Sequence, residues 1–180
     1  MGYYDDNGQP YDEVLLFKSK MLPEFKNELL RVCKELGQDP NKLVAVMRLE
    51  NGHNFPNTAQ WSKNRVGIGL IQFTSTAIQQ MNRVYKTSYT KDLIAQMSSI
   101  EQLQLVQQYY QMYKGFNSLG DYALATFAPA FMGASGNTGV YTKFKDGTRY
   151  SNNSSLDANQ DGIITAVSYT HLTLPTTPYV

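Results

Sequence analysis

Hydrophobic residues recur every three or four positions from residue 17 to about residue 127, which is the spacing of amphipathic helices. One such stripe runs through residues 23–35 and stops at Gly37, a residue that commonly ends helices. Further helices are predicted over residues 39–51, 74–85, 99–113 and 121–127. From residue 133 to residue 153, Gly, Ser and Asn dominate around short apolar pieces. The pattern therefore predicts a mainly α fold with a loop-rich C-terminal appendage.

The second predicted helix carries an acid where its pattern calls for a hydrophobic residue. Its stripe consists of Leu43, Val46, Met47 and Glu50. Asp39 suits the N-cap of this helix, and Gly52 offers its end. Partial burial would raise the pKa of the Glu50 carboxyl, as a proton donor near neutral pH requires. Spacing alone leaves open that Glu50 lies at the rim of the stripe and bonds to the next loop.

Composition sets limits on the class of protein. A chain of 180 residues with 42% hydrophobic and 17% charged residues fits one globular domain with a substantial core. The single cysteine, Cys33, excludes an intrachain disulfide, and its place on a helix stripe favours packing over chemistry. A net charge of +1 gives no reason to expect nucleic acid as a partner. The 13 tyrosines, among many amide and hydroxyl side chains, suit a carbohydrate surface, although many are expected to serve packing.

The start of the chain shows no signal peptide, so either the protein is not exported by that route or this sequence is a fragment. No apolar run is long enough to span a bilayer, and the first residues lack the pattern of a signal peptide. Residues 166–180 carry no charge and resemble a translated sequencing adapter. We expect them to be a non-native scar that replaces the natural continuation after Thr165, with a Thr/Pro-rich linker as the alternative. This interpretation removes His171 as a candidate ligand and leaves His53.

Three segments of the chain form a recognisable series: Arg-Leu-Glu-Asn at 48–51, Gly-Ile-Gly-Leu-Ile-Gln-Phe at 67–73 and Ala-Leu-Ala-Thr-Phe at 123–127. Together and in this order they resemble the goose-type lysozyme and lytic transglycosylase superfamily, and most of all its peptidoglycan-degrading domains in phage tail proteins. Two departures stand out. Asn51 follows the acid where the family often has Ser, and Phe127 with Ala128 stands where many relatives have Tyr-Asn.

The resemblance implies a lysozyme-like helical domain that cleaves the β-1,4 bond between MurNAc and GlcNAc, with Glu50 as the catalytic residue. No Asp or Glu lies between Glu50 and Asp92, so this stretch supplies no second carboxylate. A lytic transglycosylase needs only one acid and leaves a 1,6-anhydro end. A hydrolysing lysozyme, with water held by Asp92, Asp121 or another distant acid, is one alternative. A non-catalytic glycan-binding or tail-structural module is another.

The resemblance also implies which residues bind substrate and where the protein acts. The expected substrate-binding residues are Asn51, Gly69, Ile71, Gln72, Phe73, Tyr110 and Phe127. Gly67 and Gly69 would let the loop backbone approach the glycan, with Gln72 bonding to the sugar or its acetamido group. For Phe73, Tyr110 and Phe127, core packing is the alternative. The expected partner is the peptidoglycan glycan strand, and the expected location is the virion tail or the extracellular or periplasmic space.

These interpretations divide the chain into four parts. We expect a linker or frayed start at residues 1–15 and a lysozyme-like catalytic domain at residues 16–135. A loop-rich segment with a partial calcium loop follows at residues 136–165, and then the scar at residues 166–180.

The loop-rich segment contains the first nine positions of a calcium-binding loop, at residues 157–165. Asp157, Asn159 and Asp161 supply side-chain oxygens at positions 1, 3 and 5, and Ile163 supplies a backbone carbonyl at position 7. Position 12, which needs a bidentate acid, falls on Ser168. We therefore expect a structural calcium ion to be held weakly. An Asp/Asn turn without metal is the alternative.

Overall fold

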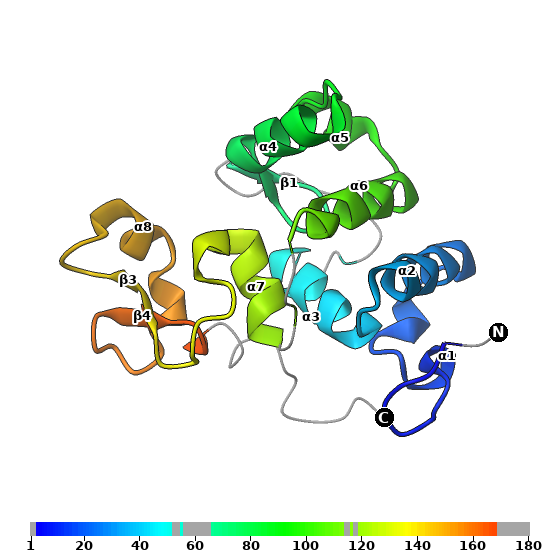
Figure 1. Ribbon diagram of the computed structural model, residues 1–180, viewed down its shortest axis with the longest axis horizontal. Helices are drawn as coiled ribbons and strands as arrows, with labels where there is room; N and C mark the ends of the chain where they lie inside the picture. Colours follow the sequence, from blue (N-terminus) through cyan, green and yellow to red (C-terminus); the bar gives the residue numbers. More distant parts are fainter. Residues whose placement is uncertain (1–2, 52–54, 56–65, 114–115, 117–118, 169–180) are drawn as a thin grey trace. The chain divides into compact units, whose positions relative to one another are not determined.

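The computed structural model describes residues 3–51, 55, 66–113, 116 and 119–168 (Figure 1). This part of the chain is mostly helical with a few short strands, which confirms the mainly α prediction. Its contacts form two compact units, Met1–Lys114 and Gly115–Val180.

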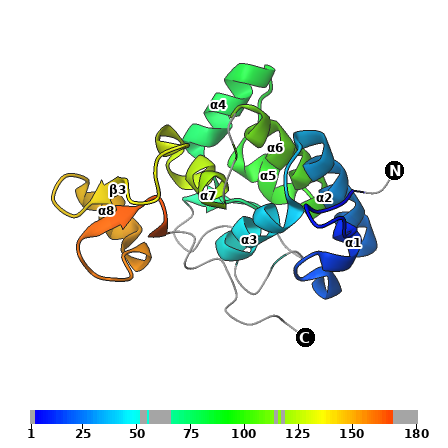
Figure 2. The same ribbon diagram turned by 60° about the horizontal axis from the view of Figure 1, so that its bottom comes forward.

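Helices build the N-terminal unit. They are α1 (Tyr11–Val14), α2 (Pro23–Leu36), α3 (Pro40–Asn51), α4 (Ser75–Tyr85), α5 (Lys91–Gln96) and α6 (Ser99–Gln111), with a short 3-10 helix at Lys18–Lys20. Helix α6 packs against both α2 and α4, as Figure 2 shows. The two strands β1 (Gly67–Ile68) and β2 (Phe73–Thr74) form an antiparallel hairpin that leads directly into α4.

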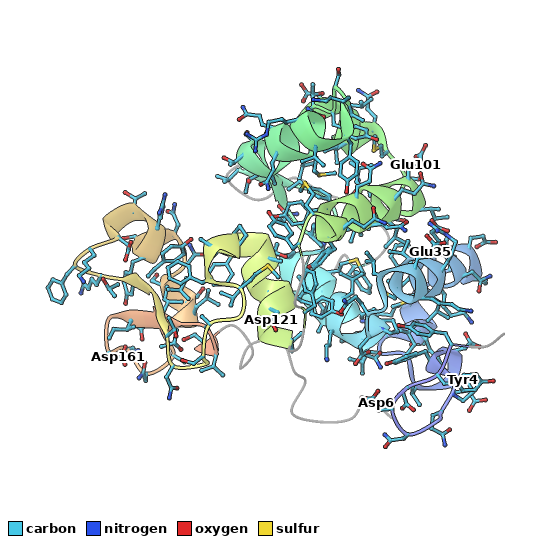
Figure 3. The ribbon with its side chains drawn as sticks, viewed as in Figure 1. Tyr4, Asp6, Glu35, Glu101, Asp121 and Asp161 are labelled. Carbon is cyan, nitrogen blue, oxygen red and sulfur yellow. The ribbon has the colours of Figure 1, made fainter. Side chains whose placement is uncertain are left out.

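The helices begin and end at the residues expected from capping chemistry. Helix α2 ends at Gly37, whose φ of 65° is left-handed, and the amide of Gly37 donates to the carbonyls of Cys33 and Lys34. Helix α6 begins with a capping box. The Ser98 hydroxyl accepts from the Glu101 amide at 3.2 Å, and the carboxylate of Glu101, which is labelled in Figure 3, accepts from the Ser98 amide at 2.7 Å.

Residues 3–14 differ from the expected frayed start. The rings of Tyr3 and Tyr11 lie 4.8 Å apart, and Tyr11 is buried. The Tyr3 hydroxyl donates to the carbonyl oxygens of Gln38 and Cys33, where α2 ends. Burial raises the pKa of Tyr3 to about 12, so its hydroxyl stays a donor at neutral pH. Tyrosine packing therefore orders a segment whose polar composition predicted a linker.

Cys33 lies in the core, as its place on the helix stripe predicted. Its side chain has no exposed surface, and burial raises the pKa of the thiol far above its usual value. Among the described residues it is a free cysteine that serves packing.

The C-terminal unit is a small α+β structure. It contains α7 (Leu119–Phe127), a 3-10 turn at Pro129–Phe131, β3 (Gly139–Thr142), α8 (Gly147–Asn152), a 3-10 turn at Ser154–Leu156 and β4 (Ile163–Thr165). Strands β3 and β4 pair antiparallel, with Thr142 opposite Ile163. Loop-rich composition therefore concealed a strand pair and a short helix.

The boundary between the units differs from the expected boundary near residue 135. Leu124 and Ala128, from α7 and the residue after it, are buried with Val140 and Ala166 in one hydrophobic cluster. Helix α7 therefore groups with the C-terminal segment, and the division falls between Lys114 and Gly115.

The first residues of the expected scar are integrated into this unit. Ala166 is buried, and its amide donates to the Thr138 carbonyl at 3.0 Å. The Val167 amide donates to the Gly136 carbonyl at 2.9 Å. His171 lies outside the described residues.

Candidate active site

Helix α3 begins in the hydrophobic core, and Glu50 lies near its C-terminal end at the edge of that core. The helix starts as predicted, because the Asp39 carboxylate caps it by accepting from the Asn41 amide at 2.8 Å. Every residue from 43 to 47 is buried, so protein surrounds more than a full turn of α3. Glu50 follows in the last turn and is half-buried. The stripe is confirmed for its three hydrophobic members, and Glu50 stands at its rim.

Asn51, the last residue of α3, connects the end of the helix to the β1–β2 hairpin. Its Nδ2 donates to the Leu70 carbonyl at 2.6 Å and to the Met47 carbonyl at 2.9 Å. Its Oδ1 is buried and has no hydrogen-bond partner among the described residues. The side-chain amide of Asn51, the residue after Glu50, thus holds the turn of the hairpin at Leu70.

The hairpin turn at residues 69–72 has a constrained backbone. Gly69 has a φ of +85° and Gln72 a φ of +52°, and the Gln72 amide donates to the Gly69 carbonyl at 3.0 Å. A Cβ at Gly67 would lie 2.7 Å from the backbone oxygen of Gln72, and one at Gly69 would lie 2.5 Å from Oε1 of Gln102. Both positions therefore need glycine because other protein atoms lie where a Cβ would be, and this need does not depend on the approach of a glycan.

Gln102 on α6 is a buried polar residue, and no pattern in the sequence predicts a role for it at this site. Its Oε1 accepts from the Leu70 amide at 3.0 Å. Its Nε2 donates to the Ile94 carbonyl at 3.0 Å and to the Met97 carbonyl at 3.4 Å, at the end of α5. Four glutamines lie between residues 102 and 108, and the helical period alone does not show which of them reaches the hairpin.

Gln72 lies in the same turn and is half-buried. Its Nε2 donates to the Gly69 carbonyl at 3.1 Å, so its amide supports the turn in which it lies. This contact agrees with the alternative that Gln72 satisfies loop backbone, and it also holds the side chain in one orientation.

Three of the expected substrate-binding residues lie in the core of the N-terminal unit. Ile71, Phe73 and Tyr110 are each 1% exposed. The ring of Phe73 packs edge-to-face on Tyr109 at a centroid distance of 5.7 Å, and Tyr109 packs in the same way on Tyr110. Packing therefore accounts for these residues, because almost none of their surface is available to a glycan.

Phe127 belongs to the C-terminal unit. It is half-buried against the cluster of Leu124, Ala128, Val140 and Ala166. Its ring contacts Tyr141 at a centroid distance of 6.0 Å, and the Tyr141 hydroxyl donates to the Phe127 carbonyl at 3.2 Å. The structure thus assigns Phe127 a packing role within its own unit.

The distant acids differ in their surroundings. Asp92 is exposed in the first turn of α5. Asp121 is buried in the C-terminal unit, where its Oδ1 accepts from the Gly133 amide at 3.0 Å. His53 lies outside the described residues.

The predicted calcium loop folds as a turn followed by a strand. Asp157 is buried, and its carboxylate accepts from the Gly162 amide at 2.9 Å, the Asp161 amide at 3.2 Å and the Tyr150 hydroxyl at 2.5 Å. The Tyr150 hydrogen bond, followed by the backbone bonds, holds the pKa of Asp157 below its usual value. Positions 7 to 9 form β4, and Asp161, labelled in Figure 3, lies in the turn before it.

Every candidate ligand in this loop is an oxygen atom, which is the donor type that calcium prefers. Asn159 and Asp161 are exposed, and they bond to each other through Nδ2 and Oδ2 at 2.8 Å. At position 12, the Ser168 hydroxyl accepts from the Thr165 amide at 3.0 Å. Within the described part of the chain, no group of three or more His, Cys, Asp or Glu side chains is arranged to hold a metal ion. The oxygen ligands therefore suit calcium, but only two of them, Asp157 and Asp161, are carboxylates.

Comparisons with protein-family models, curated proteins and solved structures found no match to this chain. Among the described residues, no helix has the length and apolar character needed to cross a membrane.

Proposed function

We propose that this protein is a lytic transglycosylase that cleaves peptidoglycan, with a lysozyme-like N-terminal domain and Glu50 as its single catalytic acid and base. The observation that carries the proposal is the bond from Asn51 Nδ2 to the Leu70 carbonyl. It joins the end of the helix that bears Glu50 to the Gly-Leu-Ile-Gln turn, and these are two of the three segments on which the resemblance to this superfamily rests.

In the proposed reaction, the protonated Glu50 carboxyl donates its proton to the glycosidic oxygen of the leaving GlcNAc, and the bond from C1 of MurNAc to that oxygen breaks. The C6 hydroxyl of the same MurNAc then attacks C1. Its proton passes to the Glu50 carboxylate, which restores the starting acid. The products are a free GlcNAc end and a 1,6-anhydro MurNAc end, and no water is consumed.

The half-buried position of Glu50 supports this double role. Access to the surface lets a glycan reach the carboxyl, which must donate a proton in the first step and accept one in the second. The expected partner is therefore the glycan strand of a cell wall, reached from a phage tail or from the extracellular or periplasmic side.

The masses of the cleavage products test the proposal. Purified sacculi are incubated with the protein, and the released muropeptides are measured by mass spectrometry. We expect sugar ends lighter by one water than hydrolysed ends, because the C6 hydroxyl replaces water as nucleophile. Hydrolysed reducing ends alone would point to a lysozyme, and no release at all would favour a non-catalytic glycan-binding module.

We further propose that residues 157–168 form a weak calcium site in the C-terminal unit. Asp157, Asn159, Asp161 and the carbonyl of Ile163 would hold the ion, which would brace the turn before β4. The bond from the Thr165 amide to the Ser168 hydroxyl supports this proposal. It is the bond that the side chain at N3 of a helix makes to the backbone N–H of the N-cap residue, with Thr165 at loop position 9 and Ser168 at position 12. A glutamate at position 12 can make the same bond and would also offer its carboxylate to the ion.

Ser168→Glu should therefore bind calcium at least about 10-fold more tightly than the parent, because it supplies the missing bidentate acid. Titration calorimetry with calcium chloride measures the affinity, and the unfolding midpoint with and without calcium provides a second readout. Adding Asp161→Asn to this variant removes a charged ligand and should reverse most of the gain. If calcium moves neither readout in Ser168→Glu, the loop is an Asp/Asn turn without metal.

A further inference from the structure

The backbone of Leu70 is held from two sides by side-chain amides. Gln102 accepts from its N–H, and Asn51 donates to its C=O. Strand pairing ends at Ile68 and Phe73, so no ladder bond is available to Leu70. Its side chain is completely buried. Because buried backbone groups need partners, these two amides decide where the turn lies.

The same contacts connect both parts of the candidate active site. Asn51 directly follows Glu50, and Gln72 lies two residues after Leu70. A displacement of Leu70 would therefore reach the end of α3 through Asn51 and the Gln72 side chain through the turn. Gln102 anchors this chain of contacts to α5 and α6, since its Nε2 donates to Ile94 and Met97 while its Oε1 accepts from Leu70.

We propose that Gln102 is a positioning residue for the cleavage reaction, an inference that rests on the proposed function. Its buried side chain fixes the Leu70 backbone and so sets the spacing between Gln72 and Glu50. Gln102 has no exposed surface, so it acts through Leu70 and touches no substrate.

A glutamine is the side chain that this position requires. It offers an acceptor to Leu70 and donors to Ile94 and Met97 from one planar group. Asparagine is one methylene shorter and would not span from α6 to both the hairpin and the end of α5. Methionine is similar in length, but it would leave the Leu70 N–H without its partner.

Gln102→Met should lower kcat/KM on glycan chains about 10- to 100-fold, because small misplacements of reacting groups have effects of this size. Hydrogen exchange at the Leu70 amide should accelerate at least about 10-fold, since the amide loses its acceptor. Both are measured well below the unfolding midpoint, so that the comparison concerns the folded protein.

Two matched variants separate positioning from stability. Gln104→Met makes the same chemical change at an exposed position of α6 and should leave both readouts at parental values. Val32→Ala removes buried methyl groups from α2 and lowers the midpoint through packing alone. If Gln102→Met loses no more kcat/KM than Val32→Ala and leaves Leu70 exchange unchanged, the proposal is overturned.

A double-mutant cycle with Gln72→Ala tests the route of the effect. If Gln102 acts by placing Gln72, the loss of kcat/KM in the double variant should be smaller than the product of the single losses. Fully multiplicative losses would contradict this route. A parent that cleaves no glycan would overturn the proposed function, whereas faster Leu70 exchange in Gln102→Met would still show that Gln102 holds the turn.

Discussion

Glu50→Gln should reduce peptidoglycan cleavage by at least about 100-fold, because general acid-base catalysis contributes factors of 10² to 10⁴. The amide has the size of the carboxyl, yet it cannot supply an acidic proton to the leaving oxygen or take one from the C6 hydroxyl. A mechanism with one catalytic carboxyl depends on Glu50 in both steps, so its loss should be close to complete. Solubilisation of sacculi and the yield of anhydro ends measure the effect.

A neutral control is available on α2. Glu24 is exposed in the first turn of that helix, and Glu24→Gln makes the same substitution away from the hairpin. It should cleave at the parental rate. Since Glu50 is half-buried at the end of α3, its substitution should change the unfolding midpoint little. Parental cleavage by Glu50→Gln would show that Glu50 is not the acid and would favour a glycan-binding module.

The helices could be predicted from the sequence because their boundaries have local causes. Gly37 ends α2 in a left-handed conformation, and Asp39 starts α3 with a cap. Ser98 and Glu101 start α6 at the expected residue. In each case, the residues that decide the boundary are close in sequence. Helix α5 was not expected, since its six residues are too few for a period to show.

The unit boundary and the order near the N-terminus could not be predicted, because they depend on distant contacts. Tyr3 reaches the end of α2 across 30 residues or more, and α7 joins Val140 and Ala166 in one cluster. A stripe of hydrophobic residues shows that a helix has a buried face, but it does not show which segment covers that face.

The candidate site also has a part that could be predicted from the sequence and a part that could not. The position of Glu50 at the end of its helix followed from the helical period, and the Gly-Leu-Ile-Gln turn followed from its motif. The connection between them did not, because Asn51 and Gln102 are amides with no periodic or charge signal. A buried amide becomes visible only when its partners are known, here the two backbone groups of one residue, Leu70.

Gly69→Ala should strongly destabilise the hairpin, for two separate reasons. The φ of +85° is unfavourable for any residue with a Cβ, at about 1–2 kcal/mol. The new Cβ would lie 2.5 Å from Oε1 of Gln102, so this side chain must move and release the Leu70 amide. An unsatisfied buried N–H adds about 1–3 kcal/mol. We expect the free energy of unfolding to fall by about 2–5 kcal/mol, as measured by urea denaturation.

Gly37→Ala separates the two contributions. Gly37 also has a left-handed φ of +65°, but no atom lies within 4 Å of the Cβ that would be added there. It should therefore lose only the conformational part, about 1–2 kcal/mol, and keep the Leu70 contact and glycan cleavage. Because Gln102 and Gly69 share that contact, adding Gln102→Met to Gly69→Ala should cost less than the sum of the two changes. Equal losses in Gly69→Ala and Gly37→Ala would mean that the approach of Gln102 to the turn contributes nothing to stability.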